Sequence, residues 1–268
     1  MTSPRLSASL VAAALLAATG PAAAESHKDY EQGKDCQLCS QGASGLELTI
    51  PLWVPIVGLG GERRNDNGDS EHFDHDTQVQ FAFMSQARLR LGPISIDLTG
   101  NGGGLGSQVI RSDEGEELGE LDLHGYFGKL VLSWYTPAYR LGQGSKSARL
   151  ALWPYAGARY AWLVGSGATA EGLYLEGNTT WGEPVFGMRT LLDMRGGWLF
   201  GVEGDVGGFN VGTELSIWVN ARVQYAMTDW WHLWLGWVLY YARLSSEDAT
   251  SVDLMLQGPG LGLGFSLF

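Results

Sequence analysis

The clearest hydrophobic pattern in the chain runs from Thr213 to Leu244, where apolar and polar residues alternate along two consecutive segments. Successive side chains of an extended strand point to opposite faces, so this alternation predicts two β-strands, each with one apolar and one polar face. A short turn at Thr228-Asp229 separates them. The apolar faces hold Leu215, Ile217, Val219, Ala221, Val223 and Tyr225 in the first strand, and Trp231, Leu233, Leu235, Trp237, Leu239 and Tyr241 in the second.

Aromatic residues stand at both ends of the second apolar face. Trp231 and Tyr241 are ten residues apart in the sequence. At ~3.3 Å rise per residue and ~40° tilt, they lie roughly 25 Å apart along a barrel axis. That spacing matches the height of the apolar band of an outer-membrane barrel, which carries an aromatic girdle at each interface. We therefore expect this hairpin to span a membrane.

Comparable alternation recurs through the rest of the chain, and we expect ten strands in all. An even number of strands returns both termini to the periplasmic side, and eight or twelve strands remain as alternatives. The predicted fold class is all-β: a closed antiparallel up-and-down transmembrane β-barrel, whose closure satisfies every backbone group in lipid. Besides the opening pair, the expected strands are Leu46–Val57, Thr77–Leu91, Ile94–Thr99, Glu120–Tyr135, Ala148–Val164, Pro184–Asp193, Trp198–Phe209 and Ser251–Phe268.

Proline, glycine and shifts of parity predict irregular pairing in three of these strands. Pro51 and Pro55 lack amide donors, so we expect a bulge or irregular pairing there. Changes of alternation near Gly128-Lys129 and at Pro259 each predict a bulge. The expected external loops are Gly60–Asp76, Gly100–Gly119 and Ser166–Trp181, with the alternative for the last that it prolongs both neighbouring strands.

The first residues predict export from the cytoplasm. Arg5 precedes an apolar run from Leu10 to Ala18, and an Ala-x-Ala site ends at Ala24. This arrangement predicts a signal peptide over residues 1–24 that is cleaved, because the apolar run is shorter than the ~20 residues of a membrane-spanning helix. We expect residues 25–43 to form a flexible periplasmic segment and residues 44–268 the barrel. The expected location is the bacterial outer membrane.

The only two cysteines, Cys36 and Cys39, lie in the segment that precedes the barrel. In an oxidising periplasm they can form a small disulfide, with idle thiols as the alternative. A thioredoxin-like redox site needs a βαβ context, and haem attachment needs a histidine where Ser40 stands. Zinc would need further ligands close by. We therefore predict no cofactor for this segment.

Charge and composition narrow the remaining possibilities. The formal net charge of −12 argues against a nucleic-acid partner. The polar run Gly60–Asp76 contains His72, Asp74 and His75, but the calcium-loop pattern requires glycine where Ser70 stands. We interpret this run as a solvated acidic loop and predict no metal site.

Charged side chains gather on the inward face if the predicted parities hold. A barrel of about eight to ten strands is filled by its own side chains, and unpaired charges inside it would be costly. We therefore expect pairs of arginine and carboxylate, with a narrow channel or a small-solute pocket as the alternative. The candidate lumen network is Arg88, Arg90, Asp97, Arg159, Arg189, Glu203, Asp205, Arg222 and His232; Glu47, Asp122, His124, Asp193 and Asn220 share the predicted face.

The sequence shows no recognisable catalytic site. Outer-membrane lipid A deacylases and phospholipases use a serine activated by a histidine, and no His-x-Ser occurs here. His124 and Ser133 have opposite parities on one strand, and His232 lacks a serine at matching depth. We therefore predict a structural or surface-interaction barrel without catalytic activity. A porin-like channel is the alternative, and a lipid-modifying hydrolase is the weaker one.

Five short motifs occur along the predicted strands: Leu52-Trp-Val-Pro55, Phe81-Ala-Phe-Met84, Glu183-Pro-Val-Phe-Gly-Met-Arg189, Gly204-Asp-Val-Gly-Gly-Phe209 and Gly258-Pro-Gly-Leu-Gly-Leu263. Together they resemble a family of small, mostly uncharacterised Gram-negative outer-membrane proteins that are broadly similar to OmpA-like and OmpX-like barrels. The resemblance spans most of residues 45–268 and implies a barrel without known catalytic residues. It also implies contact with outer-membrane lipids and lipopolysaccharide, and recognition by the barrel-assembly machinery through the C-terminal strand and Phe268.

Overall fold

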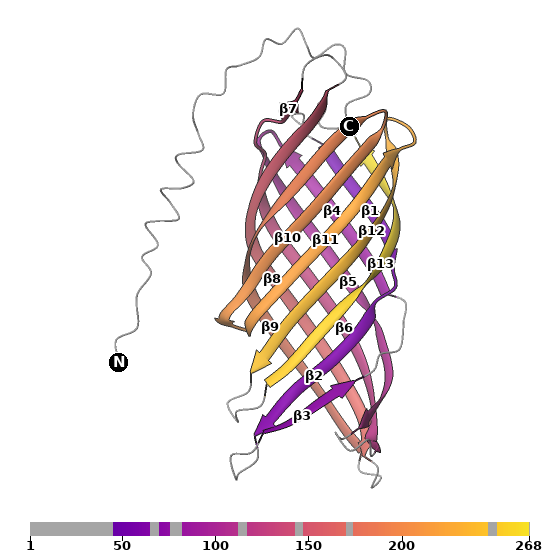
Figure 1. Cartoon of the computed structure of the whole chain (residues 1–268), viewed down its shortest axis with the longest axis vertical. Coiled ribbons are helices and arrows are strands. Elements are labelled where there is room, and N and C mark those ends of the chain that lie inside the picture. Colours follow the sequence, from indigo (N-terminus) through magenta and orange to yellow (C-terminus); the bar gives the residue numbers. More distant parts are fainter. Residues whose placement is uncertain are drawn as a thin grey trace, which may run out of the picture. The chain divides into compact units, whose positions relative to one another are not determined.

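The computed structural model describes residues 45–64, 70–75, 82–111, 117–142, 147–169, 174–245 and 251–267. Their regular secondary structure consists of strands (Figure 1), and within these ranges no helix is long and apolar enough to cross a membrane. The strands are β1 (Gly45–Trp53), β2 (Ile56–Arg64), β3 (Ser70–His75), β4 (Ala82–Leu91), β5 (Ile94–Arg111), β6 (Glu117–Trp134), β7 (Tyr139–Leu141), β8 (Ala148–Thr169), β9 (Tyr174–Arg195), β10 (Trp198–Val211), β11 (Thr213–Ala226), β12 (Trp231–Ser245) and β13 (Ser251–Leu267).

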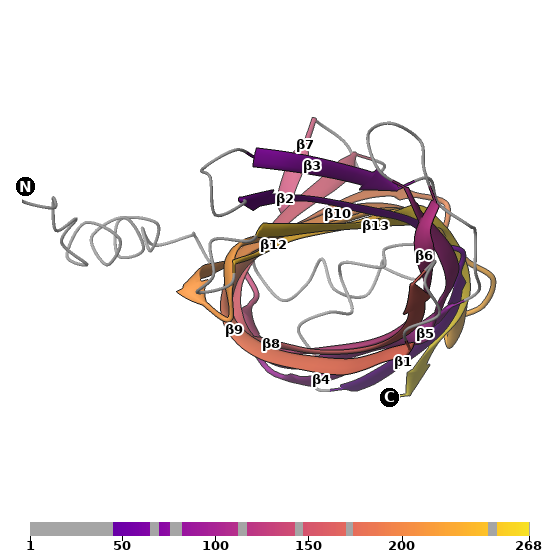
Figure 2. The ribbon, with the colours of Figure 1, turned by 90° about the horizontal axis from the view of Figure 1, so that it is seen from below.

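These segments close into one antiparallel ring (Figure 2). β13 pairs with β1 over one half of its length and with β2 over the other half. β1 and β2 therefore act as a single strand. On their other edge, β4 pairs with β1 and β3 pairs with β2. The short β7 pairs only with the start of β8. The ring thus has ten strands, and the predicted closed ten-strand barrel is confirmed.

The two ends of the barrel differ. One end holds the start of β1, the end of β13 and the β9–β10 turn, and we call it the terminal end. The opposite, loop end holds the β8–β9 and β10–β11 connections. Gly196 and Gly197, with φ of 63° and 82°, form the tight β9–β10 turn, whose positive φ at both central residues matches the twist of a hairpin. In Figure 1 the terminal end is uppermost, and the β10–β11 hairpin stops well short of β9 at the loop end.

Two expected loops are wrong. Gly60–Arg64 and Ser70–His75 continue the first hairpin, and most of Gly100–Gly119 belongs to β5 and β6. For Ser166–Trp181 the alternative is correct, because β8 and β9 extend to Thr169 and from Tyr174. The reason is that pairing with a long neighbouring strand outweighs a local composition unfavourable to strands. At Gly102, for example, the Tyr126 ring covers the space that a side chain would fill.

Two expected bulges are also wrong. β6 pairs in unbroken register through Gly128 and Lys129, and the shift lies on β5 between Gly104 and Gly106. Pro259 lies within an unbroken register of β13 against β12. The irregular pairing expected in the first strand is present at both prolines. The pairing of β1 with β4 is interrupted at Ile50-Pro51, and β1 and β2 are separated at Val54-Pro55, where the Val54 amide still donates to the Pro259 carbonyl at 3.1 Å.

Because β13 keeps its parity, its two apolar stretches face opposite sides of the wall. Leu261 and Leu263 are exposed on the outside, whereas Leu254 and Leu256 are buried inside the barrel. The expected bulge arose from assuming a polar lumen throughout. Instead, the loop half of the lumen holds an apolar cluster, which we call the loop-side cluster: Trp53, Ala82, Met84, Phe127, Ala161, Trp181, Trp218, Val238, Tyr240, Ala242, Leu254 and Leu256.

The outer face is apolar and carries aromatic pairs toward both ends. Near the terminal end the Trp198 and Tyr225 rings lie 4.7 Å apart, and Trp230 stacks on Phe265 at 6.1 Å. Toward the loop end Tyr126 stacks on Trp162 at 5.4 Å. Exposed apolar residues between them include Ile50, Leu52, Phe83, Leu89, Leu98, Leu130, Leu132, Val202, Val206, Leu235 and Trp237. This face has the chemistry expected of strands that contact lipid.

The predicted signal peptide, the segment 25–43, the cysteines Cys36 and Cys39, and Phe268 lie outside the described residues.

Candidate functional site

Charged side chains inside the barrel form a continuous chain of ion pairs in which cations and carboxylates alternate. Arg88 bridges Glu47 and Asp97, at 2.9 Å and 2.5 Å. Arg189 then bridges Asp97 and Glu203, at 3.2 Å and 2.9 Å. This first half of the chain connects β1, β4, β5, β9 and β10 through the interior.

The second half of the chain continues from Glu203. Lys129 bridges Glu203 and Asp205, at 2.8 Å and 3.0 Å. Arg159 pairs with Asp205 and also with Glu183, the latter at 2.8 Å. In all, four cations and five carboxylates alternate without a break, which is the arrangement that makes charge tolerable in a narrow interior. We call these nine residues the ion-pair chain.

Hydroxyl groups occupy further oxygens of the same carboxylates. Ser95 donates to Asp97 on its own strand at 3.5 Å. Four further donors come from strands other than those of their acceptors, so the hydrogen bonds fix the carboxylates from several sides. The donors are Ser133 to Asp97 at 2.7 Å, Tyr155 to Asp205 at 2.9 Å, Ser216 to Glu183 at 2.7 Å, and Thr213 to Glu183. The hydrogen-bond network therefore restrains the ion-pair chain in one geometry.

Aromatic rings lie against the cations of this chain. The Lys129 ammonium lies 5.1 Å from the Tyr155 ring centroid and 5.3 Å from that of Trp218. The Arg159 guanidinium lies 5.0 Å from the Tyr240 ring centroid. Both arrangements are within cation–π range. Because Trp218 and Tyr240 belong to the loop-side cluster, the ion-pair chain is in direct contact with the apolar residues on its loop side.

A second apolar cluster lies in the terminal half of the lumen. Ala151, Trp153, Leu191 and Leu199 form it, with Tyr135 packed against it. The Arg189 guanidinium lies 6.0 Å from the Trp153 ring centroid, so this cluster also touches the ion-pair chain. Apolar side chains therefore border the charges on the loop side, and on β8, β9 and β10 they also border them toward the terminal end.

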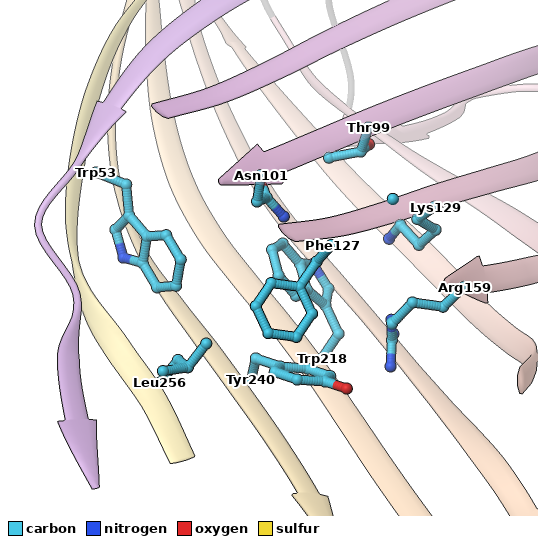
Figure 3. Close-up of a pocket in the computed structure, with 10 residues that line it drawn as sticks. Trp53, Thr99, Asn101, Phe127, Lys129, Arg159, Trp218, Tyr240 and Leu256 are labelled. Atoms are coloured by element: carbon cyan, nitrogen blue, oxygen red, sulfur yellow. The ribbon is translucent and has the colours of Figure 1, made fainter. Parts of the chain in front are cut away.

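The cavity between the loop-side cluster and the ion-pair chain is small. Figure 3 shows Trp53, Phe127, Trp218, Tyr240 and Leu256 around it, with the side chains of Lys129 and Arg159 at one side. Its volume is about 10 Å³, which is roughly the space needed by one water molecule. At this level the side chains of the barrel fill its interior.

Three other predicted residues lie nearer the terminal end. Arg222 donates to the Gln86 side chain at 3.4 Å, and Arg90 is buried on β4. The His232 Nε2 atom lies 3.8 Å from the Glu47 carboxylate. Among the described residues, Glu47 is thus the contact that links His232 to the ion-pair chain.

Some expectations about the inward face were incomplete and some were wrong. Asp122 and His124 are exposed, because their even positions on β6 point outward once the bulge is absent. Lys129 and Glu183 were missed, although they share the parities of Ser133 and Arg189. Parity along an uninterrupted strand could have identified both. Asp193 and Asn220 are buried as expected.

Ser133 is no partner for a histidine in the described part of the chain. Its hydroxyl donates to Asp97 inside the lumen, whereas the exposed His124 lies on the opposite face of β6. The two side chains are therefore separated by the barrel wall and cannot form a nucleophile–base pair.

A closed antiparallel ring with an apolar outer face and a side-chain-filled interior defines a transmembrane β-barrel of the outer-membrane class. Its fold is similar to that of the outer membrane protease OmpT from Escherichia coli, with a TM-score of 0.53 and 11% sequence identity over 83% of this chain and 97% of that one. The outer membrane protein OprG from Pseudomonas aeruginosa matches at a TM-score of 0.40 and 10% identity, over 85% of this chain and 98% of that one.

Sequence comparison adds no relative. No protein-family model matches the chain, and neither does any curated protein sequence. The likeness to the OmpT structure therefore supports the fold alone and leaves the activity to be argued from the residues themselves.

Proposed function

We propose that this protein is a sealed structural barrel that works through the hairpins at its loop end. The observation that carries the proposal is the filled lumen, in which one apolar cluster borders the ion-pair chain on its loop side, another borders it along β8, β9 and β10, and the cavity beside the chain measures about 10 Å³. Ten strands enclose only slightly more space than the eight that side chains just fill.

The ion-pair chain opposes conduction for an energetic reason. A permeating ion would have to replace its hydration shell with lumen groups that are already engaged with one another. Asp205, for example, is contacted by Lys129, Arg159 and Tyr155 at once. Separating such buried partners costs several kcal/mol, on the order of 3–5 kcal/mol for each pair broken. A passing ion gains no comparable contact in return.

The lengths of the loop-end hairpins support a role in surface interaction. β8 and β9 contain 22 residues each, whereas about 9–11 residues suffice to cross a bilayer at the usual tilt. β5 and β6 contain 18 residues each. These hairpins therefore extend beyond the apolar band and present paired backbone and side chains to the exterior.

The alternative, a narrow porin-like channel, is tested by single-channel conductance. The full chain, folded in neutral detergent, is inserted into planar bilayers with a general porin as the positive control. We expect no reproducible openings above the bilayer background in molar potassium chloride. Stepwise openings of uniform size that follow the amount of folded protein would overturn the sealed-barrel proposal.

The absence of catalytic activity remains a prediction, because the OmpT structure of similar fold belongs to a protease. Contacts with lipopolysaccharide and with the assembly machinery through Phe268 are likewise part of the proposal. Cleavage after Ala24 completes it, and N-terminal sequencing of the membrane-extracted protein would test that step.

A further inference from the structure

Three guanidinium groups gather in the terminal half of the lumen, and we call Arg88, Arg90 and Arg222 the arginine cluster. Arg88 and Arg90 belong to β4, and Arg90 pairs with Gly45 at the very start of β1. Arg222 belongs to β11, yet its Nη1 atom reaches the Gln86 side chain on β4 at 3.4 Å. The cluster therefore joins opposite parts of the ring close to the terminal end.

Glycine on the inner face of β13 makes this approach possible. β13 lies between β12 and β1, and Gly262 and Gly264 are buried on its inward side. A methyl group on Gly262 would meet the Trp234 ring, and one on Gly264 would meet the His232 ring. These two rings therefore lie directly against the inner face of β13, where a larger residue would displace them.

Positive charge exceeds negative charge around the arginine cluster. Glu47 lies within electrostatic range of all three guanidinium groups and of His232. Asp97 pairs with Arg88, but it shares its second oxygen with Arg189 from the ion-pair chain. Among the described residues, Glu47 and Asp97 are the carboxylates that form ion pairs with the cluster, and both pair with Arg88. Glu203 also attracts Arg222, but it pairs with Arg189 and Lys129.

Several donors of the cluster are also unused. Within the described residues, the Nε and Nη1 atoms of Arg90 and the Nη2 atom of Arg88 have no hydrogen-bond partner. Both side chains are at least nine-tenths buried, with relative exposures of 9% and 4%. The bond from Arg222 to Gln86 is long and its acceptor is neutral. Buried cationic donors without an acceptor are strongly unfavourable, which indicates that an acceptor belongs here.

We propose that the arginine cluster binds a small oxyanion, a phosphate or carboxylate group. Guanidinium groups present N–H donors in a planar fork that matches the oxygens of such groups, and a single negative charge would offset the local excess. Access comes from the edge formed by Glu47 and His232, whose side chains are 14% and 12% exposed. The ligand enters from the terminal end and does not cross the barrel.

The test uses inorganic phosphate as the probe and the full chain folded in neutral, phosphate-free detergent buffer. Thermal unfolding is followed against phosphate concentration, with sodium chloride adjusted to keep the ionic strength constant. We expect a saturable rise in Tm with phosphate and a matching binding isotherm by calorimetry. An equal rise with sodium chloride alone would show charge screening and overturn the proposal, as would the absence of any phosphate-dependent shift.

Two substitutions locate the effect. Arg222→Gln and Arg90→Gln each remove one guanidinium and should weaken phosphate binding at least tenfold. Without phosphate both variants should unfold at the wild-type temperature or above it, because each loses a buried guanidinium that forms no ion pair with the described residues. Arg90→Gln is measured independently, so the test remains decisive if Arg222→Gln misfolds. The mobility of unboiled samples on a gel shows whether each variant is folded. Unchanged affinity in the folded variants would overturn the assignment.

Arg243→Gln is the matched control, because Arg243 is exposed at the loop end and pairs with Asp253. It should bind phosphate like the wild type, and a tenfold loss there would count against a site at the cluster. None of these measurements depends on whether the barrel conducts ions. A failure would therefore leave the sealed-barrel proposal standing, and a leaky barrel would leave the anion site standing.

Discussion

The ammonium group of Lys129 on β6 lies 2.8 Å from the carboxylate of Glu203 on β10, inside the barrel and 74 residues away in the sequence. The same ammonium group lies 3.0 Å from Asp205. Two carboxylates two residues apart on one strand therefore share a single lysine, and both depend on it for compensation. Lys129 links the two halves of the ion-pair chain.

Substitution of Lys129 by methionine should destabilise the barrel by about 3–5 kcal/mol, because it leaves Glu203 and Asp205 buried with reduced compensation. Urea unfolding of the detergent-folded protein, followed by tryptophan fluorescence, measures the change. Arg243→Gln serves as the control, since its exposed pair with Asp253 should contribute less than about 1 kcal/mol. Equal losses in both variants would show that the Lys129 contacts contribute no more than a surface pair.

Removing the whole group of charges should be less harmful than removing the lysine alone. The triple variant Lys129→Met, Glu203→Gln and Asp205→Asn leaves no unpaired charge at this point, and replacing buried ion pairs with neutral residues is often nearly neutral. We expect it to recover at least half of the stability lost in Lys129→Met, in the same urea experiment. A triple variant less stable than the single one would mean that shape and hydrogen bonding, rather than charge balance, dominate.

Phospholipid and lipid A should not be hydrolysed by the purified barrel. Ser133 is buried and donates to Asp97, and His124 is exposed on the outer face of the same strand. Release of fatty acid from labelled lipid vesicles measures the activity, with an outer-membrane phospholipase as the positive control. Turnover that either His124→Ala or His232→Ala abolishes would show that the barrel is an enzyme.

The sequence predicted the fold well because alternation reports directly on a two-faced wall. Arg88, Asp97, Glu203 and Asp205 lie on regular strands, so parity alone placed them in the lumen. It could not indicate which of them meet, because that depends on the tilt and stagger of strands far apart in the sequence. Lys129 shows this limit, since its partners lie on β10, three strands away around the ring.

Where the prediction failed, the assumption of a uniformly polar interior was at fault. Leu254 and Leu256 look like lipid-facing residues, yet they fill the loop half of the lumen. Alternation reveals two faces but does not identify the inner one when both are apolar. Likewise the glycine-rich segment after Thr99 has a loop-like composition, and it forms a strand because β4 and β6 pair with both of its edges.

Gly258 should be intolerant of even the smallest side chain. It lies on β13 opposite the break between β1 and β2, and a methyl group there would collide with the Val54 carbonyl and approach Pro55 Cα to 3.3 Å. The obstacle is backbone, which cannot rotate away, so Gly258→Ala should cost about 1–3 kcal/mol through overpacking. Gly128→Ala is the matched control, because a methyl group there meets nothing within 4 Å and alanine suits a strand at least as well as glycine. Urea unfolding of the two variants side by side measures the difference. Equal stabilities would show that the Val54-Pro55 segment can move away from β13, and that the seam closing the barrel is looser than its register indicates.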